Sequence, residues 1–217
     1  MTYAGRLDPM AEGMLILLAG EDCKQKDMYL DLDKTYILEV LVGVATDTHD
    51  ILGIVEDGDI AKKNQITESY VKEILQSFTG IQYQAYPAYS SKTVAGKPLF
   101  SYARENLLGS IDIPGHEITL YNIELKSLQY VPIDTLVQDV LQRVDLVQGD
   151  FRQEIIKKSW HLVLESKNKD VTTITLEVNA SRGAYMRQLA YDIGKKMGVP
   201  ALALRIKRIK VGDYTLI

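Results

Sequence analysis

The sequence contains one cysteine, Cys23, and one tryptophan among its 217 residues. A single cysteine excludes a disulfide framework and a multi-cysteine zinc site, and it favours a reducing, cytoplasmic setting. No hydrophobic run approaches the ~20 residues that cross a bilayer, because the longest is Met14–Ala19. The N-terminus also lacks the order of charged, apolar and small residues that marks a signal peptide. The sequence therefore predicts a protein without a membrane span.

The composition is that of an ordinary globular domain. Hydrophobic residues make up 46% of the chain and charged residues 25%. This is enough apolar surface to offset the chain entropy lost on folding, which excludes disorder as the main state. A chain of this length fits one large domain or two small ones. We expect a single domain over residues 1–217.

Basic residues gather near the C-terminal end, although the chain as a whole is acidic. The net charge of −4 and the pI of about 5.5 argue weakly against a polyanionic partner. Between Ser181 and Lys210, however, eight basic residues are opposed by Asp192 alone, so this stretch carries +7. A field of one sign in one segment can attract phosphates. A solvated helix face followed by a basic strand explains the same pattern.

Hydrophobic periodicity predicts strands and helices that interleave without a regular βαβ rhythm. The clearest strand, Thr35–Val44, is β-branched and aromatic and is expected to be buried on both faces, with Ile51–Glu56 as its partner. Met14–Ala19 is a short strand or a helix start. We therefore expect an α+β fold with a mixed, mostly antiparallel sheet flanked by helices. The other predicted strands are Glu117–Gln129, Val171–Val178 and Lys207–Val211, and the predicted helices are Asp22–Leu32, Thr67–Thr79, Leu99–Glu105, Ile133–Val144, Glu154–Leu164 and Arg182–Met197.

The segment Ile81–Lys97 is predicted to be a long, ordered loop. It contains three tyrosines as well as Pro87 and Gly96, and Pro98 follows it. Loops of this length in compact domains are usually functional or disordered. This segment is therefore a candidate for ligand contact.

Asp8 is the first candidate for chemistry. It lies between Gly5 and Pro9, and the proline holds the preceding backbone extended. A carboxylate on a stiff loop can be presented to a cleft with little reorganisation. An aspartate that only hydrogen-bonds its own turn is the alternative, and spacing alone favours it. Glu12 could pair with Asp8 for acid–base chemistry, but carboxylates four residues apart are common on solvated surfaces.

Two further segments carry candidate groups. Asp47, His49 and Asp50 suggest a metal site, but a polar turn explains them better, and no further ligands are indicated. Gly183 permits a close backbone approach just before a helix. The N-terminus of that helix, with Arg187, is suited to a phosphate or a carboxylate, so Arg187 could anchor a buried aspartate or lie on the surface.

These segments resemble the motifs of the TruB family of tRNA pseudouridine synthases. Each resemblance is modest by itself, but six occur in the family's order between Gly5 and Ile209. Near the N-terminus, Gly5–Gly13 resembles G-x-L-D-P-x-A-x-G, Gly20–Lys24 resembles G-E-x-x-K, and Asp33–Tyr36 resembles D-K-x-Y. Gly43–Asp50 then resembles the G-x-x-T-D-T-x-D part of a fourth pattern, and Ser181–Arg187 resembles S-x-G-x-Y-x-R. Between these two, the family's RNA-gripping loop is resembled by Tyr89–Ser91, Gly96–Lys97 and Tyr102–Arg104.

The resemblance implies the pseudouridine synthase catalytic fold and an isomerase that converts a T-loop uridine of tRNA to pseudouridine, without a cofactor or a metal. It implies that Asp8 is the nucleophile that detaches uracil from the ribose. Arg187 is implied to pair with Asp8, and Tyr36 to stack on the target base. Residues 81–104 are implied to grip the RNA. The implied substrate-binding residues are Tyr185, Ile206, Lys24, Tyr89, Lys92, Lys97 and Arg104.

The chain also departs from the family pattern. We expect a single catalytic domain, monomeric, that lacks the segment preceding the Asp8 loop in the family. We also expect it to lack the C-terminal PUA-like domain, and to carry a helical insertion over residues 131–164. Two other hypotheses therefore stay open. One is a non-catalytic tRNA-binding or tRNA-folding module on the same scaffold, and the other is a hydrolase that uses the carboxylate pair of Asp8 and Glu12.

Overall fold

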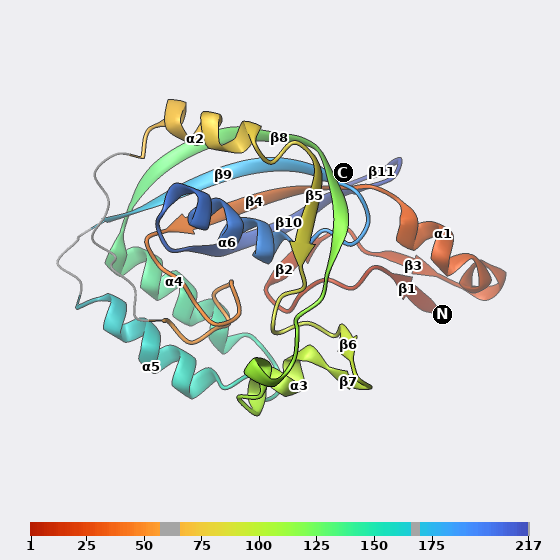
Figure 1. Ribbon diagram of the computed structural model, residues 1–217, viewed down its shortest axis with the longest axis horizontal. Helices are drawn as coiled ribbons and strands as arrows, with labels where there is room; N and C mark the ends of the chain where they lie inside the picture. Colours follow the sequence, from red (N-terminus) through yellow and green to blue (C-terminus); the bar gives the residue numbers. More distant parts are fainter. Residues whose placement is uncertain (57–65, 166–169, 217) are drawn as a thin grey trace.

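The computed structural model describes residues 1–56, 66–165 and 170–216 (Figure 1). One seven-stranded sheet forms the centre of the molecule, in the order β11-β10-β4-β9-β8-β5, with β2 paired to β10 outside this path. Its strands are β2 (Ala11–Gly13), β4 (Lys34–Val42), β5 (Gly80–Ala85), β8 (Gly115–Pro132), β9 (Asp170–Ala180), β10 (Ala201–Val211) and β11 (Tyr214–Thr215).

All neighbouring strands of this sheet are antiparallel except β2 and β10, which run parallel with Ala11 opposite Ile206. The predicted α+β fold with a mixed, mostly antiparallel sheet is therefore confirmed. Strand β4 lies in the middle of the sheet and is buried along most of its length, as its continuous apolar pattern predicts.

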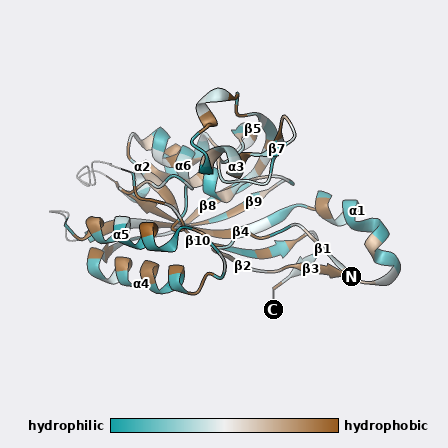
Figure 2. Cartoon of the chain, turned by 90° about the horizontal axis from the view of Figure 1, so that it is seen from below, coloured by the Kyte–Doolittle hydropathy of each residue, from teal (hydrophilic) through white to brown (hydrophobic). Residues whose placement is uncertain are grey.

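Helices cover both faces of the sheet (Figure 2). On one face, α2 (Glu68–Gln76) and α6 (Met186–Met197) enclose a core with Leu38, Val40 and Leu176 of the sheet. On the other face, α4 (Ile133–Asp145) and α5 (Gln153–Val163) enclose a second core with Leu41 and Leu202. Each helix presents an apolar stripe to the sheet, which agrees with the three- and four-residue spacing of its sequence. No helix in the described ranges is long and apolar enough to cross a membrane.

An N-terminal arm projects from one end of the sheet (Figure 1). It consists of β1 (Thr2–Ala4), β3 (Ile16–Leu18), the short 3₁₀ helix η1 (Gly20–Gln25) and α1 (Lys26–Asp31). Strands β1 and β3 pair antiparallel, with Tyr3 opposite Leu17. The open interpretation of Met14–Ala19 is thereby decided in favour of a strand, and the predicted helix Asp22–Leu32 is divided between η1 and α1.

The predicted partner strand Ile51–Glu56 is wrong. Strand β4 pairs with β9 and β10 instead, and the segment after β4 makes only isolated bridges. The reason is local, because aspartate side chains bind the backbone that a strand would use. The Leu52 amide donates to Asp50 Oδ1 at 2.9 Å, and the Ile54 amide donates to Asp47 Oδ1 at 2.8 Å.

The predicted loop Ile81–Lys97 is also partly wrong, because its first residues belong to the edge strand β5. Ile81 and Tyr83 are 73% and 74% exposed, whereas Gln84 is buried. This inverts the usual order of apolar inside and polar outside, so the alternation did not indicate a strand. A small hairpin of β6 (Thr93–Val94) and β7 (Lys97–Pro98) then leads into α3 (Leu99–Arg104), and η2 (Leu108–Ser110) follows.

Two other predicted boundaries move. Helix α6 begins at Met186 rather than Arg182, because Gly183 adopts a left-handed turn with φ of 81°. Strand β10 begins at Ala201 rather than Lys207. Its first four residues are buried on both faces, so they show no alternation from which the start of the strand could be predicted. The turn before α6 and the middle of β10 both lie close to the N-terminal loop that carries Asp8.

Candidate active site

Asp8 and Arg187 meet across the molecule, although 179 residues separate them in the sequence. Arg187 Nε donates to Asp8 Oδ2 at 2.8 Å, and an Arg187 Nη donates to Asp8 Oδ1 at 3.2 Å. The Arg187 side chain is 4% exposed, whereas that of Asp8 is 31% exposed. A bidentate pair of this kind fixes the plane of the carboxylate. The Asp8 carboxylate is therefore held in a fixed orientation, with one side open to solvent.

Backbone carbonyls and a second carboxylate complete the surroundings of Arg187. Its Nη atoms donate to the carbonyls of Thr48 at 3.0 Å and Tyr89 at 3.2 Å, and Asp50 Oδ2 lies 3.6 Å from Nε. Burial favours the neutral guanidine, but the charges of Asp8 and Asp50 outweigh it, so the pKa of Arg187 is raised. Arg187 is thus a permanent cation between two acids.

Asp50 is buried beneath this pair. Its Oδ1 accepts from Thr48 Oγ1 at 2.7 Å and from the Leu52 amide at 2.9 Å. Burial raises the pKa of Asp50, against the lowering effects of Arg187 and Thr48. No group of three or more metal-ligating side chains occurs in the part of the chain that the structure describes. The motif Thr46–Asp50, which had suggested a metal site, supports Arg187 in this structure.

Arg208 holds the loop that carries Asp8 at both ends. This arginine is 2% exposed, and it donates from Nε to the Met14 carbonyl at 2.7 Å and from an Nη to the Gly5 carbonyl at 2.9 Å. The Met14 amide donates back to the Arg208 carbonyl at 2.8 Å. The basic stretch that suggested phosphate binding therefore includes two buried structural arginines, Arg187 and Arg208. Sequence analysis did not identify Arg208, because nothing local distinguishes it from its basic neighbours.

Gly13 permits this close approach, and its replacement is expected to disturb the site. Gly13 has φ of 104°, and a Cβ there would overlap the Arg208 backbone. We expect Gly13→Ala to lower the free energy of unfolding by about 2 kcal/mol or more, as measured by urea denaturation. Gly20→Ala is the control, because Gly20 has φ of 57° but no atom nearby, and it should cost about 1 kcal/mol. Equal losses in the two variants would show that the contact with Arg208 is unimportant.

A cavity of about 490 Å³ opens on Asp8 and Arg187. This volume lies within the range of about 300–1,000 Å³ of typical small-ligand pockets. Leu7, Phe100 and Phe151 supply apolar lining, so one wall is suited to a flat ring. The polar lining comes from several segments and includes Thr48, Asp50, Tyr89, Arg104, Arg152 and Tyr185.

Tyr185 and Tyr36, two of the three tyrosines predicted for the site, differ in position. Tyr185 lines the cavity from the start of α6, where its amide donates to Gln84 Oε1 at 2.7 Å, and burial raises its pKa. Tyr36 is 9% exposed and does not line the cavity. It lies opposite Arg208 in the pairing of β4 with β10. Burial raises the pKa of Tyr36, against the lowering effect of the Arg208 charge.

The other predicted substrate-binding residues fall into two groups. Tyr89 and Arg104 line the cavity with Asp8. Ile206 is buried in β10 and lines a separate cavity of about 460 Å³, which also contains Glu12. Glu12 therefore does not face the cavity of Asp8, and the hypothesis of a carboxylate-pair hydrolase loses its geometric basis.

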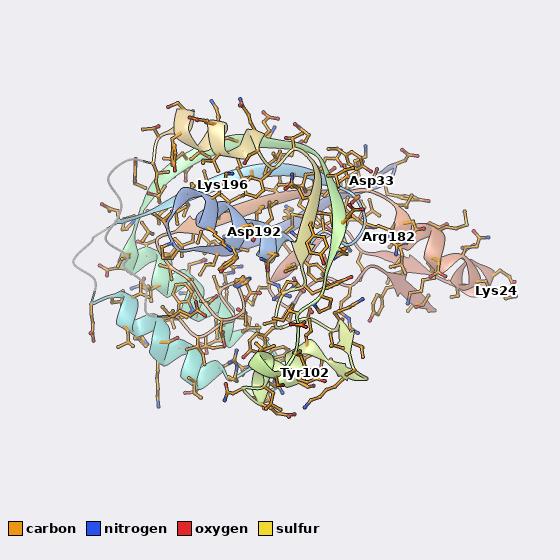
Figure 3. All side chains as sticks on the ribbon, in the orientation of Figure 1. Lys24, Asp33, Tyr102, Arg182, Asp192 and Lys196 are labelled. Atoms are coloured by element: carbon orange, nitrogen blue, oxygen red, sulfur yellow. The ribbon has the colours of Figure 1, made fainter. Side chains whose placement is uncertain are left out.

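The three predicted lysines do not line the cavity of Asp8. Lys24 pairs with Glu21 at 2.6 Å on the N-terminal arm, at the end of the molecule shown in Figure 3. Lys92 lies 4.7 Å from the centroid of the Tyr86 ring. Lys97 pairs with Glu105 at 2.5 Å and lies over the ring of Tyr102 on α3. The structure therefore brings together Asp8, Arg187, Tyr185, Tyr89 and Arg104 at one cavity. The three lysines lie outside it.

His49 lies behind Arg187 and makes the stability of the protein pH-dependent. Its ring stacks on Tyr191 at 4.1 Å. Burial and then the charge of Arg187 lower its pKa from 6.5 to about 4. The unfolded chain therefore binds a proton more readily between these values, so stability is complete above pH ~6.5 and falls as the pH drops towards 4.

We expect His49→Asn to flatten this pH dependence. Asparagine tolerates the left-handed backbone at this position, where φ is 61°. The wild type should lose about 2–3 kcal/mol more than the variant between pH ~6.5 and ~4, as measured by urea denaturation at each pH. Parallel curves for the two proteins would show that His49 is not the titrating group.

The fold is shared with solved structures that are distant in sequence. Among solved structures, a Cbf5-Nop10-Gar1 complex matches 99% of this chain and 41% of the matched chain, with a TM-score of 0.55 and 15% identity. An H/ACA RNP bound to a substrate RNA containing 2'-deoxyuridine matches 100% of this chain and 40% of that chain, with a TM-score of 0.53 and 14% identity. At these identities the likeness concerns the fold alone.

The chain belongs to the TruB family, because the sequence model described as TruB family pseudouridylate synthase (N terminal domain) matches residues 1–142. Its relatives include proteins called tRNA pseudouridine synthase B, from Ligilactobacillus salivarius (29% identical over 99% of this chain and 59% of the relative) and Thermosipho melanesiensis (31%, 99% and 55%). The relative from Psychrobacter cryohalolentis is 30% identical over 99% of this chain and 47% of its own length. The chain thus spans about half the length of the curated relatives it matches.

Proposed function

We propose that this protein is a tRNA pseudouridine synthase that isomerises a uridine of the T-loop. The observation that carries the proposal is the bidentate pair of Asp8 and Arg187 at a cavity that is large enough for a nucleoside. Family membership and the name shared by its relatives support the same activity. We also propose that the enzyme is a cytoplasmic monomer, which the single cysteine and an RNA substrate favour.

The reaction needs one nucleophilic carboxylate and a confined space. Asp8 attacks the sugar at C1′, or assists an elimination there, and the C1′–N1 bond breaks. The freed uracil turns within the cavity and a C1′–C5 bond forms. As it forms, the bond between C1′ and the Asp8 carboxylate breaks or, in the elimination route, the proton taken from C2′ is returned. The proton on C5 is then lost, and N1 gains a proton. Nothing is oxidised, reduced or hydrolysed. Arg187 holds the Asp8 carboxylate in plane, because the carbonyls of Thr48 and Tyr89 and the charge of Asp50 fix the guanidinium.

The target base must leave the RNA stack to reach Asp8. Extrusion costs a few kcal/mol, which stacking and polar contacts in the pocket offset. We place the base against the apolar wall, where Phe100 and Phe151 lie, with Tyr185 on the same cavity. Tyr36, which lies opposite Arg208 in the sheet, remains the residue proposed to stack on the target base. Residues 81–104 close on the RNA, and affinity is expected to fall with salt.

Tritium release from a tRNA transcript labelled at C5 of uridine tests this activity. The wild type should release about one tritium per tRNA, and product analysis should place one pseudouridine in the T-loop. A transcript with cytidine at that position should release none. Tight binding without release would instead favour the non-catalytic tRNA-binding module. Glu12→Gln should leave the rate within about twofold of the wild type, because Glu12 lines the other cavity.

A further inference from the structure

The hairpin of α4 and α5 reaches the cavity of Asp8 from the second face of the sheet. Phe151 and Arg152, at the start of α5, line this cavity together with Tyr89 and Arg104 of residues 81–104. The two segments touch, because an Nη of Arg104 donates to the carbonyl of Asp150 at 2.7 Å. The family model ends at residue 142, so Arg152 lies outside the matched residues. Arg104 and Arg152 therefore lie at one cavity although they come from different segments, and Arg6 and Arg187 line it as well.

The backbone of Arg152 is held in an unusual conformation. Its φ of 64° is left-handed, which is unfavourable for a residue with a side chain. Gln153 stabilises it by donating to the carbonyls of Val147 at 3.1 Å and Gly149 at 2.7 Å, and by accepting from the Phe151 amide at 2.9 Å. The direction of the Arg152 side chain is therefore set by an organised turn.

The guanidinium of Arg152 is fixed in the cavity wall. Its Nη atoms donate to Asp47 at 2.8 and 3.4 Å, and it lies 4.6 Å from the centroid of the Tyr89 ring. The Tyr89 hydroxyl donates to the same carboxylate at 3.0 Å. A guanidinium has five N–H donors, and Asp47 occupies two of them. The Arg152 side chain remains 22% exposed, so donors are available on its cavity side.

Positive charge at this cavity exceeds what its acids neutralise. Asp8 and Asp50, the two acids that line it, both face Arg187. Arg104 makes no ion pair with any residue in the described ranges, and it is bound only through the Asp150 carbonyl. Arg152 brings its own partner, Asp47, but keeps free donors. The rim is therefore suited to an anion.

We propose that Arg104 and Arg152 form a phosphate-binding pair at the mouth of the cavity, which holds a backbone phosphate beside the extruded nucleotide. The inference rests on the proposed function for its ligand, an RNA phosphodiester. A nucleotide whose C1′ lies at Asp8 carries a phosphate on each side of its sugar, and these must remain towards the rim. Planar guanidinium groups with spare donors match phosphate oxygens in geometry and charge. The α4–α5 hairpin thus positions substrate.

The test measures binding of a T-arm stem-loop RNA as a function of salt. Each phosphate contact that is lost should reduce the slope of log affinity against log salt by ~0.7–0.9. We expect Arg152→Gln and Arg104→Gln each to reduce the slope by about this amount. We also expect them to raise KM for tRNA about tenfold with kcat within about threefold. Lys158→Gln is the matched control, because this exposed lysine lies on α5 but not at the cavity, and its slope should be unchanged.

Asp47→Asn separates phosphate binding from a purely structural role of Arg152. Asparagine keeps the oxygen that accepts from the Ile54 amide, but it removes the charge that competes for Arg152. If Arg152 binds phosphate, Asp47→Asn should bind the RNA as tightly as the wild type or more tightly. If Arg152 only anchors Asp47, the variant should bind the RNA more weakly than the wild type, which would overturn the proposal. This test holds even if Arg152→Gln does not fold.

The outcomes also separate this inference from the proposed activity. An unchanged salt slope in Arg152→Gln, with normal pseudouridine formation by the wild type, would refute the phosphate pair and leave the synthase intact. A wild type that binds the stem-loop with an arginine-dependent slope but forms no pseudouridine would refute the activity and leave the phosphate pair intact.

Discussion

Asp8→Asn is expected to abolish pseudouridine formation and to leave the fold intact. Asparagine keeps the size of the side chain and an oxygen acceptor for Arg187, but it cannot act as a nucleophile at C1′. Loss of an attacking group of this kind costs at least about 10⁴-fold in kcat. Single-turnover tritium release at saturating enzyme measures the chemical step without interference from binding. The Asp8 side chain is 31% exposed, so the free energy of unfolding of the variant should lie within about 1 kcal/mol of the wild-type value.

The binding of RNA by this variant is an internal control. Affinity for the T-arm stem-loop should be equal to that of the wild type or slightly higher, because one negative charge is removed from the cavity. Residual turnover within about tenfold of the wild type would show that another group breaks the C1′–N1 bond, and the role assigned to Asp8 would then be wrong.

Arg187→Gln is expected to remove activity and a large part of the stability. The guanidinium is buried, and among the described residues it is the only cation that pairs with Asp50. Removal of one partner of a buried ion pair leaves an uncompensated charge, which costs about 3–5 kcal/mol. Urea denaturation measures this loss, and tritium release measures the activity. Affinity for RNA should change little, because Arg187 is occupied by protein acceptors.

A second substitution distinguishes the two effects. Asp50→Asn added to Arg187→Gln removes the unpaired buried charge, so about half or more of the lost stability should return. Activity should not return, because Asp8 still lacks the guanidinium that holds its carboxylate in plane. Recovery of activity together with stability would mean that Arg187 acts only by supporting the fold. A large loss of RNA affinity in Arg187→Gln would instead make Arg187 a phosphate contact.

Much of the fold follows from periodicity that is local in the sequence. The apolar run of β4, the helical stripe of α4 and the N-cap of α2, where Thr67 accepts from the Tyr70 amide at 3.2 Å, were all predictable. The prediction of a loop over Ile81–Lys97 was partly wrong because the usual alternation of buried apolar and exposed polar side chains is reversed in β5. Strand β5 exposes Ile81 and buries Gln84, because Gln84 bonds the backbone of Tyr185 at the start of α6.

The candidate site was predictable only in part. Asp8 and Arg187 carry motif signals, and their pairing was expected from the resemblance to the family. Asp50 carries a signal as well, but its local spacing suggested a turn or a metal ligand. Arg208 and Arg152 carry none, because their partners, Gly5, Met14 and Asp47, lie far away in the sequence.

The sequence by itself determined the family, the strands and helices with a clear period, and the acid and the arginine that the site requires. Only the tertiary structure decided which arginines are buried supports and which remain free for a ligand. It also decided that Glu12 faces a different cavity from Asp8. The physical reason is that periods of two and 3.6 residues report which face of an element is buried. They carry no information about which distant charge will lie opposite it once the sheet is assembled.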